Sequence, residues 1–223
     1  MQFLFSDEAG SSSLKLKGEE YKYLFKVRRH DVDDILYFRS RDRSEILHAY
    51  RVISLDGRSA SLERLSSEAK EVKSDKKLHI AWCVIDPKSV EKVLPSLNEV
   101  GVFKISFIYC ARSQKNFKMD LQRYERILET SSQQCGRSKQ MAFEVFKNLD
   151  AFLQENPQTI VLDFCDEVLG CENEFDTVLI GCEGGFSEDE RKKVEALERF
   201  RLDTPMILRS ESAAMAIASK VLV

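Results

Sequence analysis

The chain has 223 residues and a formal net charge of −3, with 43% hydrophobic and 32% charged residues. This length suits one large domain or two modest ones, and the composition excludes a disordered chain. A mildly acidic total argues against a nucleic-acid-binding protein. The charge is uneven, however: residues 75–150 hold 13 basic and 9 acidic side chains, whereas residues 151–223 hold 7 and 15. The middle of the chain could therefore bind a polyanion, although for a charge run alone a solvated helix face of mixed charge is the better explanation.

The sequence gives little evidence for a metal site, a disulfide or a membrane-spanning segment. The six cysteines include no C-x-x-C pair, and the three histidines are scattered, so we expect no metal site. Several cysteines lie in apolar runs, which predicts free buried thiols and a cytoplasmic protein. No apolar run reaches the roughly 18 residues of a membrane span, and we expect neither a membrane partner nor a signal peptide.

The first part of the chain predicts a small β-barrel. A helical stretch covers residues 19–29, and strand patterns follow at 36–40, 46–54 and 59–65, separated by turn-like segments that include Asp56-Gly57. The polar, lysine-rich segment 66–77 predicts a linker. We therefore place a first domain at residues 1–72 and a second at 76–223.

From residue 78 onward, strands alternate with helices. Strands are predicted at 78–85, 104–110, 159–165, 177–181 and 206–208, and helices at 89–101, 121–135, 187–200 and 212–223. This alternation predicts an α/β domain built on a parallel sheet with right-handed crossovers.

The clearest candidate site is the glycine-rich loop after the strand at 177–181. Gly184 and Gly185 stand in it, and Ser187 and Glu190 then form a capping box that opens a helix. Ligands of open α/β sheets bind beyond the carboxyl ends of the strands, where glycines expose backbone amides. A tight turn that needs positive φ explains the same glycines. The spacing is not that of a P-loop, which disfavours nucleoside triphosphate binding.

Two other segments carry polar residues at the ends of elements. Arg209 and Glu211 stand between a short strand and an alanine-rich helix, where they could orient a substrate or belong to a helix cap. That helix suits a packed core or a dimer seam. Arg137 follows Gly136 at the end of a helix, either as a phosphate contact or as part of a C-cap.

Taken together, these motifs resemble the RsmE family of SPOUT-class RNA methyltransferases. The resemblance is carried, in chain order, by VRRHDVDDI at 27–35, NEVGVFKI at 98–105, QQCGRS at 133–138, GCEGGFSEDE at 181–190 and ILRSESAA at 207–214. The chain departs from the family pattern at Cys182, which replaces a proline, at Gln133, which replaces a glutamate, and at residues 202–204, where the family has Leu-Gly.

The resemblance implies a PUA-like β-barrel that helps to hold RNA, followed by a SPOUT α/β domain with a trefoil knot. It implies a homodimer that uses S-adenosylmethionine to methylate N3 of a uridine in 16S rRNA of the small ribosomal subunit. Two alternatives stay open: another SPOUT enzyme, acting on tRNA or on a ribose 2′-oxygen, and a non-catalytic RNA-binding ribosome-assembly protein. The QQCGRS element and the barrel argue against the first, and the retained Glu183 and Glu211 argue against the second.

The resemblance also suggests roles for individual residues. We expect the cofactor to contact Leu162, Gly181, Cys182, Glu183, Gly184, Gly185, Leu202, Ile207, Leu208, Ser210 and Ala213. Our hypothesis for catalysis is that Glu211 or Glu183 assists removal of the N3 proton, and that Arg209 or Arg137 stabilises charge on the uracil oxygens. Both glutamates could instead fix loops by accepting backbone hydrogen bonds. Candidate RNA contacts are Arg28, Arg29, Arg112, Lys115, Arg123 and Arg137.

Overall fold

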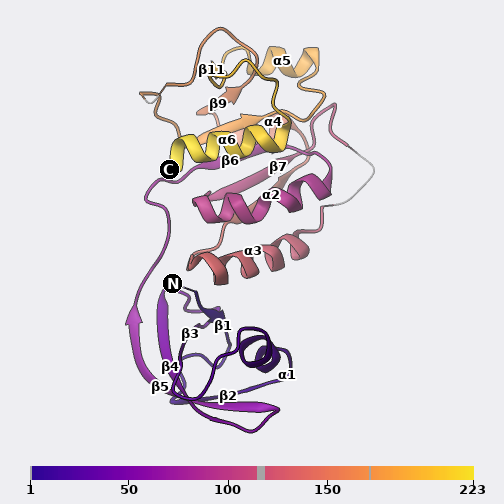
Figure 1. The fold of residues 1–223 in the computed structure, drawn as a ribbon. Helices are drawn as coiled ribbons and strands as arrows, with labels where there is room; N and C mark the ends of the chain where they lie inside the picture. Colours follow the sequence, from indigo (N-terminus) through magenta and orange to yellow (C-terminus); the bar gives the residue numbers. More distant parts are fainter. Residues whose placement is uncertain (1, 115–118, 171) are drawn as a thin grey trace. The chain divides into compact units, whose positions relative to one another are not determined.

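A computed structural model describes residues 2–114, 119–170 and 172–223. The chain divides into two compact units (Figure 1). The N-terminal unit comprises the chain up to Lys73 together with Ser132–Lys139, and the C-terminal unit comprises Ser74–Ser131 and Gln140–Val223. Lys115 lies outside the described residues.

The N-terminal unit is a curled five-stranded sheet with one short helical segment. Its strands are β1 (Leu4–Phe5), β2 (Ser13–Lys17), β3 (Ile35–Arg39), β4 (Ile46–Leu55) and β5 (Ser59–Ala69), in the order β1-β3-β4-β5-β2. The helical segment consists of α1 (Gly18–Tyr21) and a π-helical turn, η1 (Lys22–Val27). The predicted barrel is thus a half-barrel whose edges are β1 and β2.

Local chemistry explains the hairpin between β4 and β5. Gly57 has a φ of +83°, and the Asp56 carboxylate accepts hydrogen bonds from the backbone N–H and the hydroxyl of Ser59, both at 2.6 Å. This is the aspartate-glycine turn that the sequence predicts. The alternation of β2, which buries Leu14 and Leu16 and exposes its lysines, was missed because the strand has only five residues.

The C-terminal unit is built on a six-stranded sheet, all of whose strand pairs are parallel. The strands are β6 (His79–Cys83), β7 (Lys104–Ile108), β8 (Ala142–Phe146), β9 (Thr159–Leu162), β10 (Thr177–Ile180) and β11 (Arg199–Phe200), in the order β11-β9-β10-β6-β7-β8. The helices are α2 (Pro87–Val100), α3 (Leu121–Cys135), α4 (Leu149–Glu155), α5 (Glu188–Val194) and α6 (Ser210–Leu222). The predicted α/β class is confirmed.

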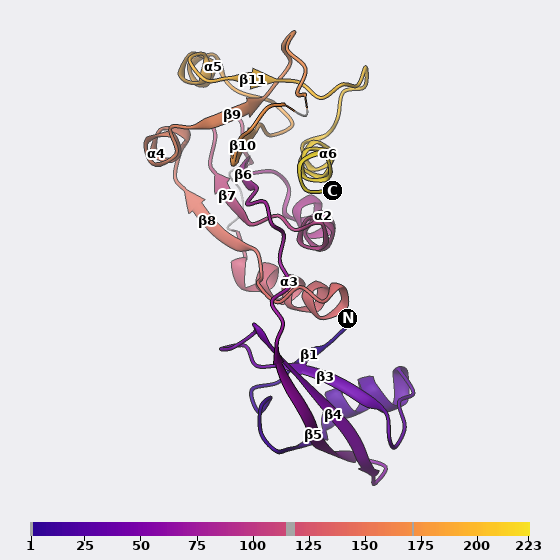
Figure 2. The same ribbon diagram turned by 90° about the vertical axis from the view of Figure 1, so that its left-hand side faces the viewer.

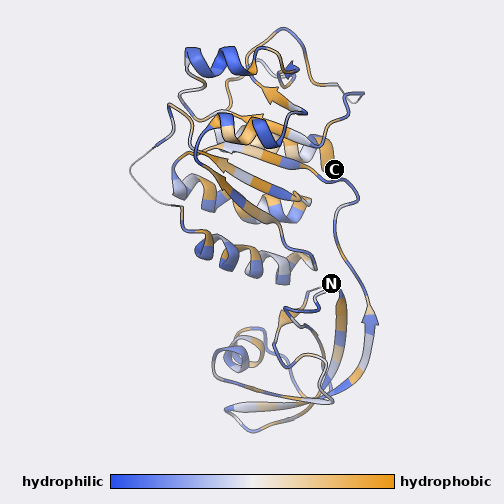
Figure 3. Cartoon of the chain, turned by 180° about the vertical axis from the view of Figure 1, so that it is seen from behind, coloured by the Kyte–Doolittle hydropathy of each residue, from blue (hydrophilic) through white to orange (hydrophobic). Residues whose placement is uncertain are grey.

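Helices cover both faces of this sheet. α2 and α6 lie side by side on one face, and α4 and α5 lie on the other (Figure 2). The strands in the middle of the sheet are therefore hydrophobic along their length, while α5 is largely hydrophilic (Figure 3). Every residue of β6 is buried, as expected for a central parallel strand.

Two predictions near the C-terminus are wrong. The helix predicted at 187–200 ends at Val194, because Arg199 and Phe200 pair with β9 as the short strand β11. The strand predicted at 206–208 is a loop in which Met206 and Ile207 are 65% and 82% exposed. β8 and α4 were not predicted, although Asn148 caps α4 by accepting from the backbone N–H of Ala151. Pairing with β9 outweighs helix propensity at residues 199–200 and pairing with β7 forms β8, whereas residues 206–208 pair with no described strand and stay a loop.

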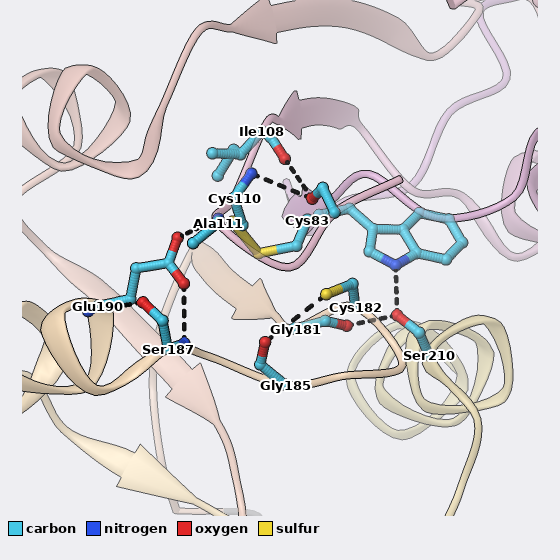
Figure 4. Close-up of a disulfide and its surroundings, with 12 residues drawn as sticks. Cys83, Ile108, Cys110, Ala111, Gly181, Cys182, Gly185, Ser187, Glu190 and Ser210 are labelled. Carbon is cyan, nitrogen blue, oxygen red and sulfur yellow. Dashed lines mark hydrogen bonds between the residues drawn. A yellow bond between two sulfur atoms is a disulfide. The ribbon is translucent and has the colours of Figure 1, made fainter. Parts of the chain in front are cut away.

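The expectation of free thiols is wrong for one pair of cysteines. Cys83 and Cys110, at the carboxyl ends of the adjacent strands β6 and β7, form a disulfide (Figure 4). Their Cα atoms lie 5.6 Å apart although 27 residues separate them, so sequence spacing could not reveal the pair. Cys135, Cys165 and Cys182 are free. Among the described residues, no helix is long and apolar enough to cross a membrane.

One buried histidine couples the parallel sheet to pH. His79 is 7% exposed, and its Nε2 and Nδ1 lie 2.8 Å from the Ser106 hydroxyl and 3.3 Å from the Thr177 hydroxyl. Burial, together with the nearby charge of Lys104, lowers the pKa of His79 to about 4. The imidazole is therefore neutral in the folded protein at neutral pH.

We expect the C-terminal unit to lose stability as the pH falls from about 6.5 to 4. In that window the unfolded chain takes up a proton at His79 more readily than the folded chain, because the folded pKa is the lower one. The free energy of unfolding should fall by up to about 3 kcal/mol, and His79→Gln should remove that component. Denaturant unfolding at pH 7 and pH 5 measures it, with His30→Gln as the control; identical pH dependence of wild type and His79→Gln would contradict it.

Candidate functional site

A cavity of about 230 Å³ opens where the loops after β9, β10 and β11 converge. Its walls come from four segments: residues 162–164, residues 180–186, part of the segment 201–208, and the start of α6. Within 180–186, Gly184 does not line the cavity. Ten of the eleven expected cofactor contacts line it: Leu162, Gly181, Cys182, Glu183, Gly185, Leu202, Ile207, Leu208, Ser210 and Ala213. The fold thus brings together segments that are up to 50 residues apart, at the carboxyl ends of parallel strands.

The glycine loop is a tight turn that opens directly into α5. The backbone N–H of Gly185 donates to the Cys182 carbonyl at 2.8 Å, and Gly185 has a φ of +63°. The predicted capping box is present: Ser187 accepts from the backbone N–H of Glu190, whose carboxylate accepts from that of Ser187. Burial raises the pKa of the Cys182 thiol, which is therefore protonated at neutral pH.

Ser210 joins three elements at the floor of the cavity. Its hydroxyl accepts from the indole N–H of Trp82 on β6 at 2.7 Å and donates to the carbonyl of Gly181 at 2.5 Å. Trp82 is fully buried and Ser210 is 5% exposed. Figure 4 shows the hydrogen bond between Ser210 and Gly181. The hydroxyl therefore fixes the start of the glycine loop against α6 and the central strand.

Glu190 fixes the other end of the glycine loop. Its carboxylate is buried; one oxygen accepts from the backbone N–H of Ala111 at 2.7 Å and the other from that of Ser187 at 2.9 Å (Figure 4). The neighbouring Arg112 donates to the Gly184 carbonyl at 2.7 Å. Arg112, a candidate RNA contact, thus supports the loop, and Gly184 faces Arg112 instead of lining the cavity.

Sequence reasoning missed several residues that line the cavity. Among them are Asp163, Phe164, Phe186 and Arg201. Asp163 forms an ion pair of 2.9 Å with Arg191 of α5, and its side chain is 8% exposed. The sequence did carry a signal for Asp163, since it is an acidic residue directly after the buried strand β9. It was missed because the strand was predicted to continue to residue 165.

The four catalytic candidates occupy different places. Glu183 lines the cavity and is exposed. Arg209 is the exposed N-cap residue of α6 and makes no side-chain cap. Glu211 follows in the first turn of α6, where a helix favours negative charge. Its Oε2 is buried, and no described residue donates a hydrogen bond to that oxygen.

Arg137 belongs to the N-terminal unit, whereas the residues that line the cavity all belong to the C-terminal unit. It is 6% exposed, and its Nε donates to the Lys139 carbonyl at 2.6 Å. Burial lowers the pKa of its guanidinium to about 10, so it stays charged at neutral pH. Gln133 of the same motif accepts from the backbone N–H of Phe5, which explains part of this motif as packing within the unit.

The remaining candidate RNA contacts differ in their availability. Arg28 is exposed and stacks on Tyr23, with its guanidinium carbon 5.3 Å from the ring centroid. Arg29 is exposed with a φ of +61°. Arg123 instead pairs with Glu91 at 2.7 Å, which neutralises much of its charge. In the described part of the chain, no cluster of side chains suits a metal ion.

Comparison with known proteins agrees with this arrangement. Residues 72–222 match the family model described as an RNA methyltransferase domain. The chain is 39% and 38% identical to "Ribosomal RNA small subunit methyltransferase E" of two Helicobacter pylori strains, 26695 and J99, in each case over 98% of both chains. It shares its fold with the crystal structure of ribosomal RNA small subunit methyltransferase E from Neisseria gonorrhoeae bound to S-adenosyl methionine, with a TM-score of 0.78 and 17% identity over 98% of this chain and 95% of that one. The chain therefore belongs to the family of ribosomal RNA small subunit methyltransferase E.

Proposed function

We propose that this protein transfers the methyl group of S-adenosylmethionine to N3 of a uridine in 16S rRNA of the small ribosomal subunit. The observation that carries the proposal is the cavity at the carboxyl ends of β9 and β10, which collects ten of the eleven expected cofactor contacts. Family membership supplies the reaction class. The proposal includes the trefoil knot of the SPOUT fold and a cytoplasmic site of action, where ribosomal RNA is found.

The residues around the cavity fit this cofactor. Apolar side chains such as Leu162, Ile180 and Leu202 suit an adenine ring, and the exposed carboxylate of Glu183 suits the cationic end of the cofactor. When bound, the cofactor supplies a methyl group on a positively charged sulfur. The protein must align that group with the uracil nitrogen and exclude water, which the converging loops can do.

Glu211 is the best placed candidate for removing the N3 proton. Its buried Oε2 has no donor among the described residues, so the carboxylate keeps an unused acceptor, and Glu211 stands in the chain between Ser210 and Ala213, which line the cavity. Arg209, two residues earlier and exposed, can stabilise the negative charge that develops on the uracil oxygens. Glu183, by contrast, lies among the cofactor contacts, which favours a role in binding.

We also propose that the enzyme is a homodimer. Met206 and Ile207 at the rim of the cavity are 65% and 82% exposed, which suits coverage by a second copy.

The exposed Arg28 and Arg29 are suited to RNA phosphates, whose contacts would set affinity while a splayed uridine sets specificity.

The direct test is to incubate the protein with labelled S-adenosylmethionine and unmodified small subunits or 16S rRNA, and to map the label. The proposal predicts one labelled uridine, modified at N3. Label on a ribose, transfer to tRNA in a parallel incubation, or no transfer at all to either form of the ribosomal RNA would contradict it.

Ser210→Ala should weaken cofactor binding and lower stability. The substitution leaves the indole N–H of Trp82 and the carbonyl of Gly181 without this partner, which should cost about 1–3 kcal/mol of unfolding free energy. Because the glycine loop loses its anchor, we expect affinity for S-adenosylhomocysteine to fall about threefold to tenfold. Calorimetric titration and heat unfolding measure both effects. Ser219→Ala in the last turn of α6 is the control, and equal losses in the two variants would refute the role of Ser210.

Glu211→Gln should slow methyl transfer while leaving cofactor binding nearly intact. A general base typically contributes about 100-fold or more to the rate, and the amide cannot take up the N3 proton. The single-turnover rate on RNA measures the effect. Glu188→Gln, which changes an exposed residue in the first turn of α5, is the matched control. A Glu211→Gln rate equal to that of wild type would exclude Glu211 as the base.

A further inference from the structure

We infer that Asp163 binds the ribose hydroxyls of S-adenosylmethionine and thereby selects a ribonucleoside cofactor. The inference rests on the proposed function, because it concerns the cavity to which that function assigns the cofactor. Asp163 follows β9 directly and lines this cavity.

The backbone fixes where Asp163 stands. Its N–H donates to the carbonyl of Phe200 at 3.0 Å, so the residue continues the pairing between β9 and β11. On its other side, β9 pairs in parallel with β10, whose end begins the glycine loop. Asp163 therefore lies at the end of the strand next to the loop. Dinucleotide-binding folds use an acidic side chain in the same unit as a glycine-rich turn to accept a hydrogen bond from a ribose hydroxyl.

The Asp163 carboxylate has acceptor capacity that the protein does not use. Oδ2 accepts from Nη1 of Arg191 at 2.9 Å, whereas no described residue donates to Oδ1. A carboxylate offers about four lone-pair positions, and a largely buried one is costly unless donors fill them. The side chain is 8% exposed, and because Asp163 lines the cavity, that remaining surface is open to a bound ligand. A ligand that brings hydroxyl donors into the cavity would satisfy it.

Arg191 holds this carboxylate against the glycine loop. Besides its ion pair with Asp163, its Nη2 lies 3.8 Å from the position that a Cβ atom on Gly185 would take. The pairing offsets the negative charge of Asp163, which suits it to neutral hydroxyls more than to a cation. Glu183, exposed and lining the same cavity, has no ion-pair partner in the part of the chain that the structure describes. It is therefore the better site for the cationic end of the cofactor.

Calorimetric titration of the full chain tests the inference. The ligands are S-adenosylhomocysteine, 5′-methylthioadenosine, which keeps the ribose but lacks the amino-acid part, and the 2′-deoxy and 3′-deoxy forms of the latter. Wild type should bind at least one deoxy form about tenfold more weakly than 5′-methylthioadenosine. Asp163→Asn should weaken S-adenosylhomocysteine and 5′-methylthioadenosine by a similar factor and should lose most of the discrimination against that deoxy form.

Asp150→Asn is the matched control. It makes the same substitution and breaks an ion pair of 2.7 Å with Lys193, which stands on α5 as Arg191 does. Asp150 does not line the cavity. Its affinities should equal those of wild type, and heat unfolding checks that both variants fold. The comparison of ribose and deoxyribose ligands on wild type needs no variant.

Three results would overturn the inference. Equal binding of both deoxy forms and 5′-methylthioadenosine by wild type would show that the ribose hydroxyls are not recognised. An Asp163→Asn loss seen with S-adenosylhomocysteine but not with 5′-methylthioadenosine would assign the carboxylate to the amino-acid end. Failure of wild type to bind S-adenosylhomocysteine at all would reject the proposed function, and the inference with it.

Discussion

The hydroxyl of Ser210 is the contact on which the site depends most. It accepts a hydrogen bond from the indole N–H of Trp82 and donates one to the carbonyl of Gly181. A single oxygen therefore joins the central strand β6, the end of β10 and the first turn of α6. Trp82 and Ser210 are both buried, so the loss of this hydroxyl would leave the indole N–H of Trp82 without a partner in the interior. At the other end of the same loop, the Glu190 carboxylate performs the equivalent task with two backbone N–H groups.

These two anchors explain how a loop with two glycines can hold a defined shape. Gly185 supplies the positive φ that the turn requires, and the loop is then fixed at Gly181 and at Ser187. Cys182, which stands where the related family has a proline, is held by the turn itself: its carbonyl accepts from the N–H of Gly185. The stiffness that a proline would give is provided here by hydrogen bonds. The glycines thus form the tight turn, and the same turn leaves Gly181 and Gly185 lining the cavity.

Local patterns in the sequence were enough to predict the α/β class and the main strands, and the resemblance to the family supplied the residues expected around the cavity. The buried runs of β6 and β10 and the capping box of Ser187 are such patterns. Sequence reasoning failed where partners distant in sequence decide. Arg199 and Phe200 read as the end of a helix but pair with β9, and the disulfide between Cys83 and Cys110 depends on strand adjacency. The hydrogen bond from Arg112 to the Gly184 carbonyl, 72 residues away, was not predicted, and Asp163 was missed because the strand was predicted too long.

We propose that the loops after β9, β10 and β11 form one cofactor site. A crystal structure of the protein grown with S-adenosylhomocysteine tests this most directly. The adenosine should occupy the cavity bounded by residues 162–164, 180–186 and 201–208, with the glycine loop and the Ser210 hydrogen bonds unchanged. Density for the ligand elsewhere on the molecule, or a cavity left empty at saturating ligand, would contradict it.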